Sequence, residues 1–232
     1  PLTEGPHTLS ATATDAAGNV SDSGNSVTVN IDLTPPAASN LVVTNDNGTT
    51  AIIVGNNGVT NDTTPLLSGT AEPGSSVEIY DGTTLLTTVQ ADPTSGEWNY
   101  TADFESGSSH ALSVVVIDAA GNQVPASDVV NISISTEIPD AVVDLTVSNN
   151  NGSTLVTIPD NGSTNDTTPE LNGTSTAPSG SIITISAVFD NVAQVLGTAT
   201  VGADGKWSFI TSVLPAGEYS VSVTVTDAAG NE

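Results

Sequence analysis

The chain has 232 residues, and 26 Asp and Glu residues against one Lys and no Arg give it a formal net charge of −25. This charge excludes a nucleic-acid-binding protein, which needs a basic surface to displace counterions, and it disfavours binding to anionic lipid. The absence of Cys leaves neither disulfides nor thiolate metal ligands, and no apolar run approaches the ~20 residues of a membrane-spanning helix.

The sequence repeats itself with a period of about one hundred residues. Asp-Ala-Ala-Gly-Asn occurs at Asp15–Asn19, Asp118–Asn122 and Asp227–Asn231, with spacings of 103 and 109 residues. Asn-Asp-Thr-Thr-Pro occurs at Asn61–Pro65 and again, 104 residues later, at Asn165–Pro169. A unit of this length is too long for a solenoid repeat and has the size of a complete domain.

The frame of the repeat predicts three domains in chain order. Residues 1–33 are expected to be the C-terminal part of one repeat, residues 34–136 a complete repeat, and residues 137–232 a repeat that lacks its last strand. Because the chain contains no Met, we expect it to be a segment of a longer array.

Hydrophobic residues alternate with a period of two, which predicts strands. The pattern begins at Leu9, Ala11 and Ala13, and it is clearest at Leu112, Val114 and Val116. Further positions of the same kind are Val27, Val29, Ile31, Val130, Ile132, Ile134, Val221, Val223 and Val225. Turns rich in Asn, Asp, Gly and Pro recur between them, and no stretch of ten or more residues has a helical pattern. The sequence therefore predicts an all-β fold of tandem immunoglobulin-like antiparallel β-sandwiches in an extended array, with a closed barrel as the alternative.

Five motifs in a fixed order give the units a family resemblance. Besides Asn-Asp-Thr-Thr-Pro, they are Thr14–Asn19, Ile31–Pro36, Gly69–Gly74 and Asp204–Trp207. The units resemble the bacterial immunoglobulin-like repeats of giant, type I-secreted surface adhesins, and the resemblance covers essentially the whole chain.

The resemblance implies a structural stalk or spacer segment of a large extracellular adhesin at the bacterial cell surface. In such a protein, calcium between domains stiffens the rod, and the whole contributes to cell adhesion and biofilm formation. The implied partners are neighbouring repeats of the same chain and, through other regions, a host or abiotic surface.

The recurring aspartates Asp15, Asp118 and Asp227 are the first candidate functional residues. Asp118 continues the inward-facing parity of Leu112, Val114 and Val116 at the end of a strand. A carboxylate in that position needs a partner, because an unpaired buried charge costs several kcal/mol, and one Lys cannot supply it. Two alternatives remain: amides of the aspartate's own loop, or a divalent cation.

The expected sandwich topology brings further oxygen ligands to the loop of Asp118. The loop between the last two strands of an immunoglobulin-type sandwich lies at the end where the chain enters. Asp32 on the entering segment and Glu72 in a neighbouring turn should therefore lie near Asp118 and Asn122. Carboxylate and carbonyl oxygens of this kind are the ligands that Ca²⁺ prefers, so these residues are predicted to bind calcium.

The second junction departs from this pattern. Ser135 and Ala177 stand at the positions of Asp32 and Glu72, which leaves Glu137 or Asp140 to accompany Asp227. Weaker calcium occupancy or a different ligand set is expected there.

The aspartates of Asn-Asp-Thr-Thr-Pro, Asp62 and Asp166, are expected at the opposite end of each sandwich. They are candidate calcium ligands, and the alternative is that they only form turns before the proline.

The sequence does not predict an enzyme. His7 and His110 occupy a position that Tyr219 takes in the third copy, so they behave as interchangeable strand residues. Two other functions are alternatives to the spacer. One is a glycan- or protein-binding module that uses Trp98 or the acidic turns, and the other is a self-assembling surface filament in which the incomplete last repeat accepts a strand from a neighbour.

Overall fold

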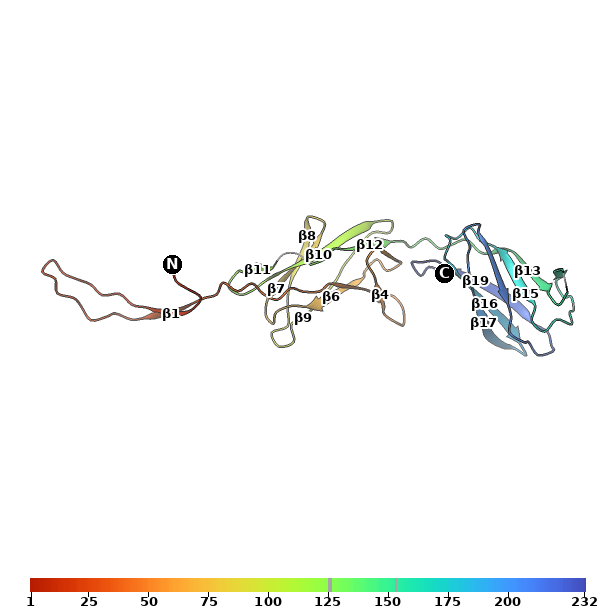
Figure 1. The fold of residues 1–232 in the computed structure, drawn as a ribbon, viewed down its shortest axis with the longest axis horizontal. Helices are drawn as coiled ribbons and strands as arrows, with labels where there is room; N and C mark the ends of the chain where they lie inside the picture. Colours follow the sequence, from red (N-terminus) through yellow and green to blue (C-terminus); the bar gives the residue numbers. More distant parts are fainter. Residues whose placement is uncertain (125–126, 153) are drawn as a thin grey trace. The chain divides into compact units, whose positions relative to one another are not determined.

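A computed structural model describes residues 1–124, 127–152 and 154–232, and its described residues contain strands and turns but no helix (Figure 1). None of them forms a helix long and apolar enough to cross a membrane. The chain divides into two compact units. Unit 1 comprises Pro1–Asn57, Thr64–Asp103 and Ser109–Ile132, and unit 2 comprises Gly58–Thr63, Phe104–Ser108 and Ser133–Glu232.

Unit 1 begins with a two-stranded antiparallel ribbon. Strand β1 (Gly5–Leu9) pairs with β2 (Val27–Ile31). The expected inward-facing residue Leu9 is 49% exposed and Val27 is 65% exposed, because two strands alone have no second sheet to cover them.

Two sheets form the first sandwich, as the period of two predicts. The first sheet has the order β4-β3-β6-β9. Its strands are β3 (Val42–Asn45), β4 (Ile52–Val54), β6 (Leu66–Thr70) and β9 (Glu97–Thr101). The second has the order β5-β12-β10-β7-β8, and β11 also pairs with β10. Its strands are β5 (Gly58–Thr60), β7 (Ser76–Asp81), β8 (Thr84–Gln90), β10 (Ser109–Ile117), β11 (Gln123–Val124) and β12 (Val130–Ile134).

The core of this sandwich contains alternate residues of neighbouring strands. Leu112, Val114 and Val116 of β10 are at most 1% exposed, which confirms their predicted inward parity. Val77 and Ile79 of β7 are fully buried beside them.

The second sandwich, in unit 2, repeats this plan. One sheet has the order β14-β13-β15-β18, and the other has the order β17-β16-β19. The strands are β13 (Val143–Asn149), β14 (Val156–Ile158), β15 (Glu170–Thr174), β16 (Ile182–Phe189), β17 (Val192–Thr200), β18 (Lys206–Ile210) and β19 (Ser220–Thr226). Leu171, Ile183, Ile185 and Trp207 anchor its core. The all-β fold of antiparallel sheets is therefore confirmed.

Each sandwich buries one tryptophan against a glycine of the neighbouring strand. Trp98 of β9 is 2% exposed and lies opposite Gly69 of β6. Trp207 of β18 is 3% exposed and lies opposite Gly173 of β15. Because both indoles are buried, neither offers a face on which a sugar could stack.

Candidate joint sites at the Asp-Ala-Ala-Gly-Asn loops

The three Asp-Ala-Ala-Gly-Asn loops close on themselves in the same way. In the second loop, Asp118 Oδ1 accepts hydrogen bonds from the backbone N–H groups of Ala120 and Asn122, each at 2.8 Å. Asp118 Oδ2 accepts a third from the Asn122 side-chain amide, also at 2.8 Å. The same three bonds recur at Asp15 and at Asp227. The loop's own amides therefore supply the partner that each carboxylate needs.

Glycine and hydrogen bonding together set the loop's conformation and charge. Gly121 has φ of 92°, in the left-handed region that glycine adopts without steric cost. The side-chain amide of Asn122, together with backbone N–H donors, lowers the pKa of Asp118, and Asn19 does the same for Asp15. These carboxylates are therefore ionised acceptors at neutral pH.

The asparagine of the loop also holds the segment that enters the repeat. Asn122 Nδ2 donates to the carbonyl oxygen of Asp32 at 3.2 Å in addition to its bond with Asp118. In unit 2, Asn231 Nδ2 donates to the carbonyl oxygen of Ser135 at 2.9 Å and to Asp227 Oδ2 at 3.0 Å. One amide nitrogen thus joins two oxygens, one from the loop and one from the entering segment.

The predicted carboxylate ligands of the first junction do not gather into a cluster. The register places the turn that contains Glu72 beside the end of β10, because Ser76 lies opposite Ile117. The Glu72 side chain is nevertheless exposed, and Asp32 Oδ1 accepts the backbone N–H of Thr34 at 3.0 Å. Within the part of the chain that the structure describes, no three His, Cys, Asp or Glu side chains are grouped so that they could hold a metal ion.

At the second junction the acidic candidates are also separate. Asp140 is exposed, and its Oδ2 accepts the hydroxyl of Thr176 at 2.9 Å. Glu137 is exposed as well. The entering segment thus reaches the Asp227 loop through the Ser135 carbonyl rather than through a carboxylate.

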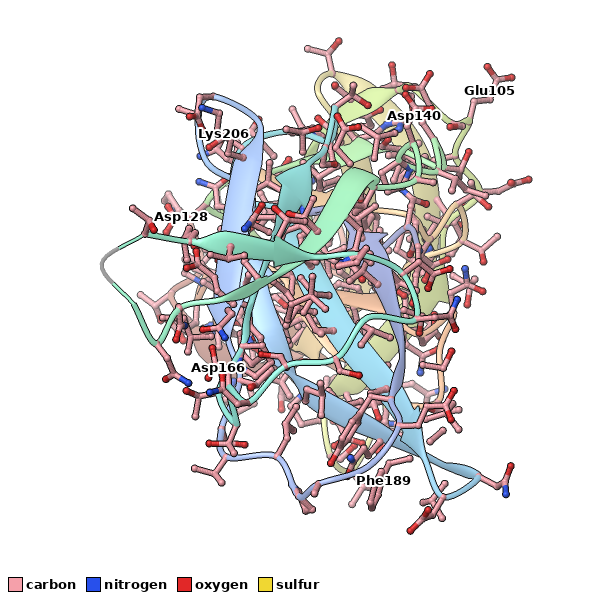
Figure 2. The ribbon with its side chains drawn as sticks, turned by 90° about the vertical axis from the view of Figure 1, so that its right-hand side faces the viewer. Glu105, Asp128, Asp140, Asp166, Phe189 and Lys206 are labelled. Carbon is pink, nitrogen blue, oxygen red and sulfur yellow. The ribbon has the colours of Figure 1, made fainter. Side chains whose placement is uncertain are left out.

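The Asn-Asp-Thr-Thr-Pro aspartates are buried, with Asp62 1% and Asp166 6% exposed. Asp166 Oδ2 accepts the backbone N–H of Asn150 at 2.8 Å, and its Oδ1 accepts that of Thr168 at 2.9 Å. These bonds, with the one from Asn150 as the largest contribution, lower the pKa of Asp166. Figure 2 shows Asp140 at one end of the second sandwich and Asp166 toward the other. Asp166 therefore ties the end of β13 to the start of β15, and its ligand role stays a prediction.

The sequence did not indicate the role of two asparagines. Asn231 bridges the loop and the entering segment, although only its counterpart Asn122 was a predicted site residue. Asn61 donates its backbone N–H to the carbonyl oxygen of Ala229 at 3.0 Å. The available signal was the invariance of the asparagine in all copies of both motifs.

Comparison with known families finds one match that covers most of the chain. The profile of the family described as "Bacterial Ig-like domain" matches residues 33–136 and 137–232. Comparison with curated proteins found no match.

Several solved structures are similar to the chain. One, described as giving structural insight into host cell surface retention of a 1.5-MDa bacterial ice-binding adhesin, is 20% identical, with 99% of this chain and 71% of that chain covered and a TM-score of 0.30. A tetra-tandem repeat in the extending region of a large adhesion protein is 22% identical, with 99% and 55% covered and a TM-score of 0.30. The BSP domain of a biofilm associated protein is 18% identical, with 74% and 26% covered and a TM-score of 0.27.

Proposed function

Because the chain belongs to the bacterial Ig-like domain family, we propose that it is a spacer segment of a large extracellular adhesin at the bacterial cell surface. The observation that carries the proposal is the repeated joint: in two successive repeats the loop asparagine binds the backbone of the entering segment. A spacer needs joints of this kind, because they couple each domain to the chain that precedes it.

The composition supports a mechanical role rather than a catalytic one. The chain has a formal net charge of −25, so neighbouring molecules repel one another and remain separate. The two indoles are buried in the sandwich cores, so neither Trp98 nor Trp207 presents its ring to a ligand at the surface. The segment positions other regions of the adhesin, and those regions contact the target surface.

We also propose that Ca²⁺ stiffens the joint at the Asp118 loop. The ligand chemistry fits this ion, because Asp118 Oδ2 and the Asp32 carbonyl oxygen both accept hydrogen bonds from Asn122 Nδ2, which holds two oxygens near each other, and each oxygen keeps a second lone pair. The amide of Asn122 also carries an oxygen, and the Asp32 carboxylate belongs to the same residue as one of the facing oxygens. A divalent cation bound there would offset the repulsion between the carboxylates. At the second loop, Ser135 offers a carbonyl but no carboxylate, so weaker binding is expected.

Thermal unfolding with calcium and with EDTA tests this joint. Ca²⁺ that binds only the folded state should raise the unfolding free energy by about 2.7 kcal/mol at a hundredfold excess over Kd. Asp32→Asn should remove most of this gain. The matched control Asp204→Asn, which removes an exposed carboxylate from the β17–β18 turn, should retain it. Equal unfolding in calcium and EDTA would overturn the calcium joint and leave the spacer function to be tested separately.

A further inference from the structure

Within unit 2, the two recurring motifs of the sequence meet. The backbone N–H of Asn61, in the Asn-Asp-Thr-Thr-Pro segment of the complete repeat, donates to the carbonyl oxygen of Ala229 at 3.0 Å. Ala229 lies in the Asp-Ala-Ala-Gly-Asn loop of the following repeat. The two bonded residues are 168 positions apart (229 minus 61), and nothing in the local sequence of either motif predicts the contact.

The entering segment is held between the same two motifs. The backbone N–H of Ser135 donates to the carbonyl oxygen of Thr60 at 2.9 Å, directly before Asn61. The carbonyl oxygen of Ser135 accepts the side-chain amide of Asn231, also at 2.9 Å. Ser135 is thus hydrogen-bonded through its N–H to the residue that precedes the first motif, and through its carbonyl oxygen to the second motif.

The third Asp-Ala-Ala-Gly-Asn loop, which contacts Asn61, is more deeply buried than the other two. Ala229 is 6% and Asn231 is 7% exposed. Their counterparts Ala17, Asn19 and Ala120 are exposed, and Asn122 is half-buried, although all three loops have the same internal hydrogen bonds. The internal hydrogen bonds of the loop therefore do not bury these residues, and the third loop differs in its contacts with Asn61 and Ser135.

The segment that donates this hydrogen bond shows the same difference. Asn61 is half-buried, whereas its counterpart Asn165 is exposed. Gly230, with φ of 93°, faces Asn61, because a Cβ placed there would lie 3.6 Å from Asn61 Nδ2. The loop is small enough at this point to let its backbone approach the other motif.

We propose that Asn-Asp-Thr-Thr-Pro is a docking face for the Asp-Ala-Ala-Gly-Asn loop of the repeat that follows. The partner of Thr164–Asp166 is therefore the Ala-Ala-Gly-Asn loop of another repeat of the same type. Recognition rests on a backbone N–H donated to an alanine carbonyl, in a loop whose shape is fixed by its aspartate. This interface goes beyond the spacer function, and it needs no metal ion.

Hydrogen exchange of single backbone amides, measured by NMR on the full chain in EDTA, tests the interface. The Asn61 amide should exchange at least about tenfold more slowly than the Asn165 amide, because only the former donates to a docked loop. Ala229→Asp places a charged side chain in the contact while the bond from its N–H to Asp227 remains. This substitution should remove the protection of Asn61, and the matched control Ala17→Asp should not.

Protection of the β16 amides in both variants shows that the second sandwich remains folded. Equal exchange of Asn61 and Asn165 in the unsubstituted chain would overturn the proposal, as would unchanged protection of Asn61 in Ala229→Asp. Since the measurement is made in EDTA, failure of the calcium joint cannot mimic either result.

Discussion

Replacing Trp98 by Ala is expected to lower the unfolding free energy of the first sandwich by about 3–5 kcal/mol, as is usual when a buried indole is removed. Trp98 is 2% exposed, and its Nε1 donates to Ser39 Oγ at 2.9 Å in the interior. The change therefore leaves a cavity and removes the hydrogen bond that the Ser39 hydroxyl accepts, while the bond that this hydroxyl donates to the Asn40 carbonyl oxygen remains. Urea unfolding followed by circular dichroism measures the loss, and retention of full stability would contradict the packing role.

A matched pair of variants separates the hydrogen bond from the packing. Trp207 Nε1 is buried without a hydrogen-bond partner among the described residues, and Val142 packs against its cluster. Trp98→Phe loses a bond that Trp207→Phe does not lose, so it should cost about 1 kcal/mol more. Equal losses in the two variants would show that the bond to Ser39 does not stabilise the fold.

Gly69→Ala is expected to destabilise the same sandwich by about 1–3 kcal/mol or more, through overpacking. A Cβ at this position would collide with the Asn40 carbonyl oxygen and lie 2.8 Å from Trp98 Cζ2. At Gly173 the corresponding distances are 3.0 Å to the Val143 carbonyl oxygen and 3.1 Å to Trp207 Cζ2.

Gly173→Ala is therefore the matched control: the substitution is the same, but the neighbouring atoms lie farther from the added Cβ. Its midpoint of urea unfolding should fall less than that of Gly69→Ala. The reverse order would mean that the backbone beside Gly69 shifts more easily than the distances indicate.

The fold was predictable where one face of a strand is buried, because burial imposes a period of two on the sequence. Leu112, Val114 and Val116 are an example. The two residues of β11 are too few to show any period, so its pairing with β10 could not be predicted. At Leu9 the alternating pattern predicts a buried face, but Leu9 is exposed because no second sheet covers the strand.

The second repeat period, 109 residues against 103, was visible in the sequence, but the sequence did not show where the longer repeat differs in structure. Hairpin β16–β17 is longer than β7–β8, and its end is fastened by Phe189 stacked on Tyr219, with ring centroids 4.7 Å apart. In the first sandwich, His110 holds the corresponding position through Asp81 at 2.8 Å. Two unrelated contacts thus perform the same task, and no motif links them.

The candidate site was predictable only in part. The placement of Asp118 at a strand end follows from parity, but parity does not distinguish a loop amide from a cation as its partner. The bond between Asn122 and Asp32 joins residues 90 positions apart. It depends on how the entering segment passes the loop, which local sequence does not determine.

Stretching single molecules tests the spacer function most directly. If the chain is a spacer of independently folded repeats, each sandwich should unfold in its own abrupt step and release about 30 nm, since roughly one hundred extended residues span somewhat more than that. The steps should return after relaxation. Smooth extension without steps would contradict the proposed function, because a segment that yields continuously cannot hold a binding region away from the cell.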